Sequence, residues 1–443
     1  MKRLLYILLL PALLVTVSAC RPDPVTPDNP KEQKTIACLF ERTLPEDVTD
    51  LTIQEELLTI HNTTTGQDVE YKTLEGIKLA PGLYNLNYTT TCRYKLHGVA
   101  MEGRLVAQIE NMEVTDQTTE PLKLRLELRI VPTVQDFVIQ EIFFTGTLTP
   151  AGKQYHGTSY VVLYNGTDRV LYADGIAFCE SGFNPARKFD YKPDIRQEAM
   201  AVHAVYVIPG SGKEHPVNPG ERLILCDIGI DHKVNNPNAF DLSKANFEWY
   251  DESSSPAHQD FDSPTVPNLD KWYCYTKSFF ILHNRGFASY AIARMPITKE
   301  EYLKDYKYDY TYVLTHNGNS YDMSGSCYKL PNDWIIDGVN CSVEAVHQWT
   351  ILPETIDAGY TNCGTVDGQK DRYFHSVRRK YLGKDAEGRM ILQDTNNSTE
   401  DFNPMVTASL IEEQGTAINA KGTPCTTKTY DGVVPIDKES LCY

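Results

Sequence analysis

Apolar and polar residues alternate in many short stretches of this 443-residue chain, and turn-forming residues such as Pro, Gly, Asn and Asp separate the stretches. In one stretch, leucine occupies every second position from Leu122 to Leu128. A period of two places such side chains on one face of an extended strand. A helical pattern occurs only in short pieces, as where Thr298 and Glu301 form a capping-box pair. The chain is therefore predicted to be mainly β, and its many short strands favour β-sandwiches.

One stretch, "SYVVLYNGTDRVLYADGIAF" at residues 159–178, alternates on both sides of an Asn-Gly pair. We interpret it as two strands joined by a tight turn, because Asn-Gly readily supplies the positive φ that such a turn requires. Pro219-Gly220 is expected to form a similar turn before the next strand. Tyr164 and Asn165 are accordingly expected to support the scaffold rather than to bind a ligand.

The N-terminus predicts an exported, lipid-anchored protein. Residues 1–19 have a basic start, an apolar run and then small residues, which is the layout of a secretory signal peptide. The run is interrupted by Pro11 and is too short to span a bilayer. The four residues ending at Cys20, "VSAC", resemble the lipobox of bacterial lipoproteins, in which the cysteine receives a diacylglycerol group. Each buried methylene of such an anchor contributes about 0.8 kcal/mol. Residues 20–34, rich in Pro and charge, are predicted to form a flexible tether.

The charge of the chain limits its partners. The formal net charge is −17, and loss of a leader that carries Lys2 and Arg3 makes it more negative. Nucleic-acid binding requires clustered Lys and Arg, so we expect no nucleic-acid partner. Contact with the outer membrane would come from the lipid on Cys20.

Ten further cysteines fit an exported chain, in which disulfides are permitted. They are Cys38, Cys92, Cys179, Cys226, Cys274, Cys327, Cys341, Cys363, Cys425 and Cys442. Their pairing cannot be read from the sequence. Disulfides and buried free thiols both remain open, and a zinc site is disfavoured because no C-x-x-C pair occurs.

The strand pattern divides the remaining chain into two sandwiches and a tail. In residues 35–131, "IKLAPGLYNLNYTT" resembles the transthyretin-like and carboxypeptidase-regulatory sandwiches. In residues 136–415, "DFVIQEIFF", "YVVLYNGTDRVLYADGIAF", "VNPGERLILCD", "FFILHNRGFASYAIA" and "WIIDGVN" follow one another in the order of a lamin-tail domain. That resemblance implies an immunoglobulin-like sandwich, here with long insertions. Residues 416–443 are expected to lie over the surface.

A longer set of motifs carries a more specific resemblance. "FDSPTVPNLDKWYCY", "CYKLPNDWIIDGVNCSVE", "YFHSVRRK" and "LQDTNNSTEDFN" resemble Bacteroidales lipoproteins described as domain of unknown function 4876. The resemblance implies an envelope lipoprotein that is encoded beside TonB-dependent outer-membrane transporters. It implies no catalytic residues.

The insertions of the second sandwich are rich in aromatic residues, which stack on sugars or pack against other proteins. The candidate ligand or partner contacts are Trp249, Tyr250, Trp272, Tyr273, Tyr306, Tyr308 and Tyr310. Alternatively, these side chains cover the sandwich as a satellite core.

Several polar clusters are candidate metal or anion sites, but a structural role is expected for each. Asp227, Asp231 and His232 follow a strand, as metal ligands could. The segment "DTNNSTED" spaces Asp394, Asn396, Ser398 and Glu400 like a calcium loop but lacks its central glycine. Of Arg378 and Arg379, alternation predicts that one points inward and pairs with Asp337, while the other faces solvent.

We therefore predict a non-catalytic outer-membrane or cell-surface lipoprotein with no cofactor and no bound metal. It is expected to be a binding or accessory component of a TonB-dependent nutrient or metal uptake system. Nucleophile elbows, zinc helices and a complete phosphate loop are absent from the sequence. One alternative is a polymer hydrolase that uses Asp251, Glu252, Asp260 and Asp262 of the insertions. Another is a structural or adhesive envelope protein.

Overall fold

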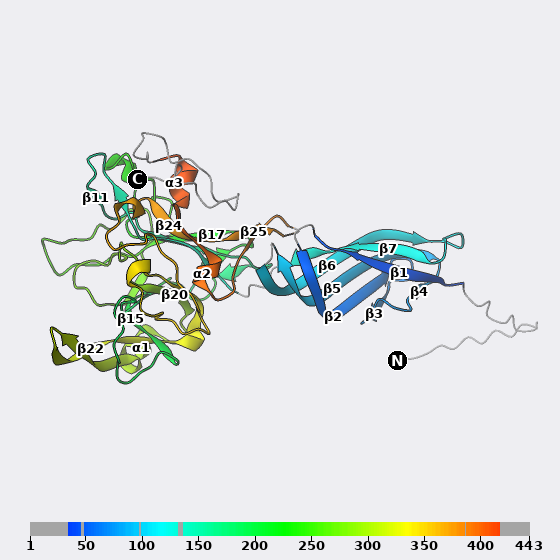
Figure 1. The fold of residues 1–443 in the computed structure, drawn as a ribbon. Helices are drawn as coiled ribbons and strands as arrows, with labels where there is room; N and C mark the ends of the chain where they lie inside the picture. Colours follow the sequence, from blue (N-terminus) through cyan, green and yellow to red (C-terminus); the bar gives the residue numbers. More distant parts are fainter. Residues whose placement is uncertain (1–33, 46–47, 97–98, 132–135, 386, 417–443) are drawn as a thin grey trace, which may run out of the picture.

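The computed structural model describes residues 34–45, 48–96, 99–131, 136–385 and 387–416, and these residues form a mainly β protein, which confirms the predicted fold class. An N-terminal lobe, β1 to β8, and a C-terminal lobe follow one another along an elongated molecule (Figure 1). The predicted lipidation site, Cys20, and nearly all of the predicted C-terminal extension lie outside the described residues.

The N-terminal lobe is a sandwich of two sheets. The five-stranded sheet has the order β3 (Gln67–Tyr71), β2 (Val48–Asn62), β5 (Gly82–Leu96), β6 (Val99–Val114) and β8 (Arg129–Val131). The three-stranded sheet has the order β4 (Lys78–Leu79), β1 (Ile36–Thr43) and β7 (Leu122–Glu127). One hydrophobic core contains side chains from both sheets, including Leu124 and Leu126. The leucine alternation therefore marks a strand with one buried face, as predicted.

The C-terminal lobe is a second sandwich. Its six-stranded sheet has the order β18 (Phe247–Glu248), β17 (Arg222–Cys226), β12 (Tyr160–Tyr164), β9 (Val138–Phe143), β24 (His375–Arg379) and β27 (Phe402–Thr407). Its seven-stranded sheet has the order β21 (Lys307–His316), β22 (Asn319–Pro331), β15 (Ala199–Val207), β14 (Ile176–Ser181), β20 (Ser289–Arg294) and β23 (Ile335–Asn340), with β19 (Asp270–Cys274) beside β15. The main core lies between these sheets and includes Val161 and Phe178.

The remaining described strands form three two-stranded sheets. They pair β10 (Thr147–Leu148) with β11 (Gln154–Tyr155), β13 (Leu171–Tyr172) with β16 (Pro216–Val217), and β25 (Tyr381–Lys384) with β26 (Met390–Leu392). Short helices are α1 (Lys299–Asp305), α2 (Ser398–Asp401) and α3 (Ser409–Gln414), and the 3-10 turns are η1 (His232–Val234), η2 (Asn332–Trp334), η3 (Glu344–Val346) and η4 (Lys370–Arg372).

The expected hairpin at residues 159–178 is wrong. β12 belongs to the six-stranded sheet, β14 belongs to the seven-stranded sheet, and β13 between them pairs with β16. The stretch is thus a connection from one sheet to the other. Alternation shows which face a residue takes but not which strand it pairs with, so it could not separate the two arrangements. Asn165 is fully buried, and its side-chain amide donates to the carbonyls of Arg169 (2.9 Å) and Val217 (2.8 Å).

The predicted insertions contain strands as well as loops. The predicted insertions lie between residues 178 and 219, 226 and 279, and 296 and 334. β15, a largely buried strand within the seven-stranded sheet, lies in the first of them, and β21 and β22 form a long hairpin in the last. Before that hairpin, Thr298 and Glu301 form the predicted capping box of α1. Gly220 has a φ of 80°, as expected for its turn. In the described part of the chain, no helix is long and apolar enough to cross a membrane.

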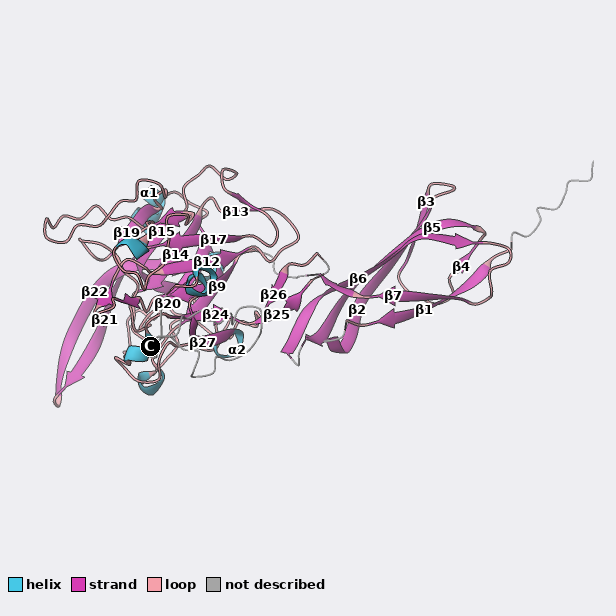
Figure 2. Cartoon of the chain, turned by 90° about the horizontal axis from the view of Figure 1, so that it is seen from above, coloured by secondary structure: helices cyan, strands magenta, loops and turns pink. Residues whose placement is uncertain are grey.

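The hairpin of β25 and β26 lies where the two lobes meet (Figure 2). Leu382 and Ile391 belong to the hydrophobic core of the N-terminal lobe. On its other side, the backbone N–H of Met390 donates to the hydroxyl of Tyr164 at 2.9 Å. This hairpin therefore connects the N-terminal core with β12 of the C-terminal sandwich.

Candidate functional site

A cavity of about 620 Å³ lies in the C-terminal lobe, and we call it the aromatic cavity. Three segments line it: residues 183–201, Tyr308 at the start of β21, and residues 348–354. The first segment connects β14 with β15, and the last follows β23. Five of the lining side chains are aromatic: Phe183, Phe189, Tyr191, Tyr308 and Trp349.

The rings of the aromatic cavity form one contiguous cluster. Phe183 and Tyr191 are stacked, with ring centroids 3.8 Å apart. The Trp349 ring lies 6.2 Å from Phe183 and 6.3 Å from Tyr191, and Phe189 lies 4.7 Å from Tyr312 of β21. Phe183, Phe189, Tyr191 and Trp349 are only half-buried. These four rings therefore retain surface that a ligand can contact.

Hydrogen bonds hold the two loops of the cavity together. Trp349 Nε1 donates to the carbonyl of Asn184 at 3.0 Å, and the backbone N–H of Gln348 donates to the carbonyl of Pro185 at 2.9 Å. In return, the backbone N–H of Lys188 donates to Gln348 Oε1 at 2.9 Å. The Trp349 ring is therefore fixed by its own side chain and by its neighbour.

Arg196 fastens the third segment. Its Nε donates to the carbonyl of Thr350 at 3.1 Å, and its Nη2 donates to Thr350 Oγ1 at 2.9 Å and to the carbonyl of Leu352 at 2.8 Å. Its Nη1 contacts Glu354 Oε1 at 3.3 Å. All three guanidinium nitrogens are thus engaged within the protein.

The rim of the aromatic cavity is polar. Its charged side chains are Lys188, Asp190, Asp194, Arg196 and Glu354. Burial, supported by neighbouring tyrosines, raises the pKa of Tyr191, and burial raises the pKa of Tyr308 to about 12. Both phenols are therefore neutral at physiological pH and act as hydrogen-bonding groups on apolar rings.

The predicted aromatic contacts lie in different environments in the structure. Trp249 is fully buried in the main core, where it stacks on Phe178 with centroids 5.8 Å apart, so its assignment as a surface contact is wrong. A polar sequence neighbourhood concealed its inward direction. Tyr250 is half-buried and does not line the cavity.

The other predicted aromatics pack on the seven-stranded sheet or reach the cavity. Trp272, Tyr273 and Tyr306 pack against the hydrophobic cluster that includes Tyr302. Tyr308 lines the aromatic cavity, and Tyr310 lies 5.2 Å from Phe183, centroid to centroid.

Sequence reasoning missed most of the cavity. Phe183, Phe189 and Tyr191 lie between β14 and β15, and Trp349 follows β23; none of the four is among the predicted aromatic contacts. The run "FNPARKFDYKP" at 183–193, with three aromatic residues among charged and turn-forming ones, is the signal that could have indicated this surface.

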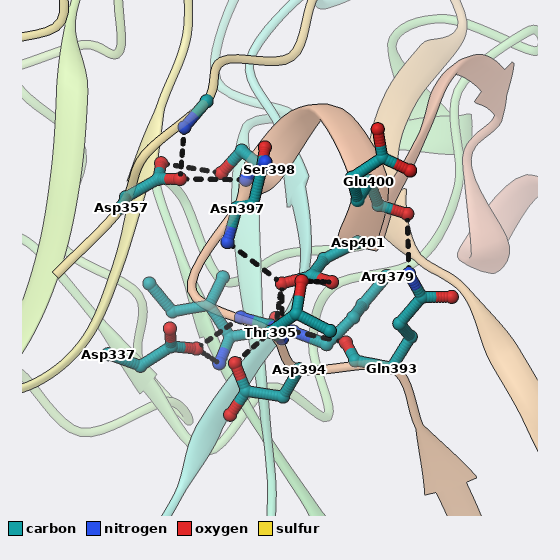
Figure 3. Close-up of polar contacts among 12 residues, drawn as sticks. Asp337, Asp357, Arg379, Gln393, Asp394, Thr395, Asn397, Ser398, Glu400 and Asp401 are labelled. Carbon is teal, nitrogen blue, oxygen red and sulfur yellow. Dashed lines mark hydrogen bonds and ion pairs between the residues drawn. The ribbon is translucent and has the colours of Figure 1, made fainter. Parts of the chain in front are cut away.

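Arg379 points inward, which confirms the prediction that one of the two arginines does so (Figure 3). Its Nη2 lies 2.6 Å from Asp337 Oδ2, and its Nη1 lies 3.0 Å from Asp394 Oδ1 and 3.7 Å from Asp401 Oδ2. Burial disfavours the guanidinium charge, but these carboxylates outweigh burial and raise the pKa of Arg379. The cluster is a satisfied buried ion network and not an anion site.

Arg378 was expected to face solvent, and that expectation is wrong. Arg378 is 2% exposed, and its Nη1 lies 3.0 Å from Glu412 Oε2 of α3. Because α3 covers the outer face of β24, both faces of this strand are buried. Strand alternation cannot reveal a covering helix that comes later in the chain.

The polar residues of "DTNNSTED", which are spaced like calcium ligands, contact other protein groups instead. Asp394 faces Arg379, and Ser398 donates to Asp357 through its hydroxyl (2.6 Å) and its backbone N–H (2.7 Å). The side-chain oxygens of Asp394 and Ser398 therefore have separate partners within the protein (Figure 3).

Two of the remaining polar candidates, Asp231 and His232, also have structural partners. Asp231 caps η1 by accepting from Lys233 N, and His232 is buried with its Nδ1 3.0 Å from the hydroxyl of Tyr155. Asp227 is also buried, at 4% exposure. We see no convergence of these three groups on a common ligand position.

Of the carboxylates considered for hydrolysis, Asp251 is 1% exposed and accepts hydrogen bonds from Tyr206 (2.8 Å) and from the backbone N–H of Phe280 (2.7 Å). Its other oxygen pairs with Lys271 at 2.6 Å. None of the four carboxylates lines the aromatic cavity.

A different group has the spacing of metal ligands. Ligand atoms of Asp174, Glu214 and His215 lie within 4.8 Å of one another. Asp174, however, accepts from the backbone N–H groups of Gly212 (3.1 Å), Glu214 (2.9 Å) and His215 (2.9 Å). These bonds fix the loop between β15 and β16 and account for both oxygens of Asp174.

The eight cysteines within the described ranges are free, and all except Cys274 are buried. Cys425 and Cys442 lie outside the described residues. Of the alternatives that the sequence left open, the described part of the chain therefore shows buried thiols.

Comparisons with known proteins agree with the motif resemblance. Residues 218–409 match the family model described as protein of unknown function, DUF4876, which confirms the resemblance found in the sequence. The chain is similar to the crystal structure of a DUF4876 family protein from Bacteroides thetaiotaomicron VPI-5482, with 20% identity, a TM-score of 0.58 and coverage of 88% of this chain and 99% of that chain. At this identity the likeness concerns the fold.

A second solved structure, described as "a putative cell adhesion protein" from Bacteroides eggerthii DSM 20697, is 9% identical and covers 67% of this chain and 80% of that chain. Its TM-score of 0.16 is too low for a shared fold. No curated protein matches the chain.

Proposed function

We propose that this chain is a non-catalytic, lipid-anchored binding protein of the outer membrane, in which the aromatic cavity receives the ligand. The observation that carries the proposal is that cavity, with four partly exposed rings fixed on loops of a rigid sandwich. A concave site of mixed apolar and polar lining is where small ligands bind in most proteins. Its lining contains no His and no Cys, so nucleophile and base pairs that use those residues are missing from it.

The arrangement of the lobes supports this proposal. β1 begins at the end of the N-terminal lobe that points away from the C-terminal lobe (Figure 1). β15, β21 and β22 lie at the opposite end of the molecule, and Figure 2 shows the same separation from above. A lipid on Cys20, followed by the tether at residues 20–34, would therefore hold the protein at one end and present the cavity at the other.

The proposed partner is a TonB-dependent outer-membrane transporter, to which the protein would deliver a nutrient. To test this, the full chain with a C-terminal tag is expressed in its own cells and purified from solubilised outer membranes, and Cys20→Ala is processed in parallel. We expect the native chain in the outer-membrane fraction with a transporter bound, and the Cys20→Ala variant outside that fraction. Unchanged fractionation of Cys20→Ala would refute the anchor. Recovery of no transporter would refute the partner.

A further inference from the structure

We infer that the ligand of the aromatic cavity is a short segment of a neutral glycan, an inference that rests on the proposed binding function. The first argument comes from the rings. Tyr191 and Trp349, and beside them Phe183 and Phe189, are partly exposed around one concavity. The C–H groups on one face of a pyranose ring carry slight positive charge and pack well on the negative face of an aromatic ring.

The second argument comes from charge. The aromatic cavity has three carboxylates, Asp190, Asp194 and Glu354, against the two cations Lys188 and Arg196. The Arg196 nitrogens are already bonded to Thr350, Leu352 and Glu354. Asp190 in turn pairs with Lys192 at 2.8 Å. An anionic ligand such as a uronic acid or a sulfated sugar would thus find no excess of positive charge to bind it. A neutral ligand needs no such excess.

The third argument comes from the polar rim. Asp190, Asp194 and Gln348 each have a partner within the protein, namely Lys192, the backbone N–H of Arg196 and the backbone N–H of Lys188. A wholly apolar ligand would remove their remaining hydrogen-bonding positions from water without replacing those hydrogen bonds, and that desolvation is costly. Sugar hydroxyls can donate to these carboxylates and exchange hydrogen bonds with the amide. A glycan therefore satisfies the rings and the rim together, which neither a lipid chain nor an anion does.

The fourth argument comes from preorganisation and size. Trp349 is fixed by its bond to the Asn184 carbonyl, and Tyr308 by a 2.6 Å bond from its hydroxyl to the carbonyl of Pro193. Rings that are already ordered lose little entropy when they bind. The volume of about 620 Å³ lies within the range of small-molecule sites, so a few sugar residues fit better than a folded partner.

Isothermal titration calorimetry on the purified full chain tests the inference. The probes are tetrasaccharides of the cello, xylo, manno and malto series, with tetragalacturonate as the acidic comparison. We expect at least one neutral probe to bind and tetragalacturonate not to bind. Trp349→Ala should weaken binding by about tenfold or more, as truncation of a central aromatic contact does. Phe189→Ala, at the edge of the cluster, should weaken binding less.

Tyr321→Ala is the matched control, because Tyr321 is a 49% exposed ring on β22 that does not line the cavity. Its affinity should equal that of the native chain. Thermal melts establish that each variant is folded. If Trp349→Ala does not fold, Phe189→Ala replaces it as the cavity variant. The inference is overturned if no neutral probe binds, if tetragalacturonate binds as tightly, or if Tyr321→Ala weakens binding as much as the cavity variants. Co-purification of a transporter is independent of this result, so failure of the glycan inference and failure of the proposed function are distinguishable.

Discussion

Arg379 Nη2 of β24 lies 2.6 Å from Asp337 Oδ2 of β23, and this ion pair joins the six-stranded sheet to the seven-stranded sheet of the C-terminal sandwich. The same carboxylate oxygen accepts the backbone N–H of Ile139 at 2.6 Å. Both side chains are nearly inaccessible, at 1% and 5% exposure. Because water does not reach this pair, loss of one partner leaves a buried charge without compensation.

Arg379→Ala should therefore destabilise the protein by about 3–5 kcal/mol, the range for breaking a buried ion pair. Guanidinium denaturation followed by tryptophan fluorescence measures the change in the free energy of unfolding. Arg285→Ala is the matched control, because Arg285 pairs with Asp367 on the surface, where both are well exposed. Loss of that exposed pair should cost less than about 1 kcal/mol. Equal effects of the two substitutions would show that the Arg379 network does not hold the sheets together.

Removal of divalent cations should leave the stability unchanged. Asp394 and Asp401 already face the guanidinium of Arg379, and Ser398 donates to Asp357. A metal that bound the folded state would raise the melting temperature by mass action. We expect the melting temperatures in EDTA and in millimolar calcium to agree within about 1 °C, because no folded-state site responds. A reproducible rise with calcium would mean that the "DTNNSTED" segment binds the ion after all.

Buried thiols should resist alkylation in the native protein. Burial raises the pKa of Cys179, Cys341 and Cys363, and the thiolate is the reactive form. Cys274 is only partly buried, with its pKa raised by burial to about 11, and provides an internal comparison. With iodoacetamide at mildly alkaline pH, mass spectrometry should find Cys274 labelled first. The three buried thiols should be labelled only after unfolding, without a reductant. If they require reduction, they are disulfide-bonded in the exported protein.

The sequence predicted the β class, the strand at Leu122–Leu128, the cap at Thr298 and the inward arginine, because each depends on local spacing. Pairing between strands is not local, so residues 159–178 read as a hairpin although β12 and β14 lie in different sheets. The sequence also predicts that Arg378 faces solvent, because the contact that buries it is not local either. The helix that covers it, α3, begins about thirty residues later.

The candidate site was less predictable than the fold. Its rings come from positions as distant as Phe183 and Trp349, and only the folded chain places their centroids 6.2 Å apart. Aromatic content alone cannot separate such rings from Trp249, whose neighbours in the sequence are just as polar but whose side chain lies in the core. Burial decides the role, and burial depends on how the two sheets pack.

The contribution of Glu180 to the stability of the protein should fall as the pH rises from about 5 to 8. Glu180 is 7% exposed on β14, and burial raises its pKa to about 8. Between its ordinary pKa and this value, the unfolded chain releases the proton while the folded chain keeps it, so increasing pH favours the unfolded state. The slope from this one group is at most about 1.4 kcal/mol per pH unit.

Glu180→Gln removes this titration, because the amide stays neutral at every pH. We expect its melting temperature to depend less on pH than that of the native chain and to exceed the native value near pH 8. Glu300→Gln, an exposed carboxylate on α1, is the control and should keep the native pH dependence. Parallel pH profiles of the native chain and Glu180→Gln would show that Glu180 is already ionised in the folded state, which would require a cation or water beside it.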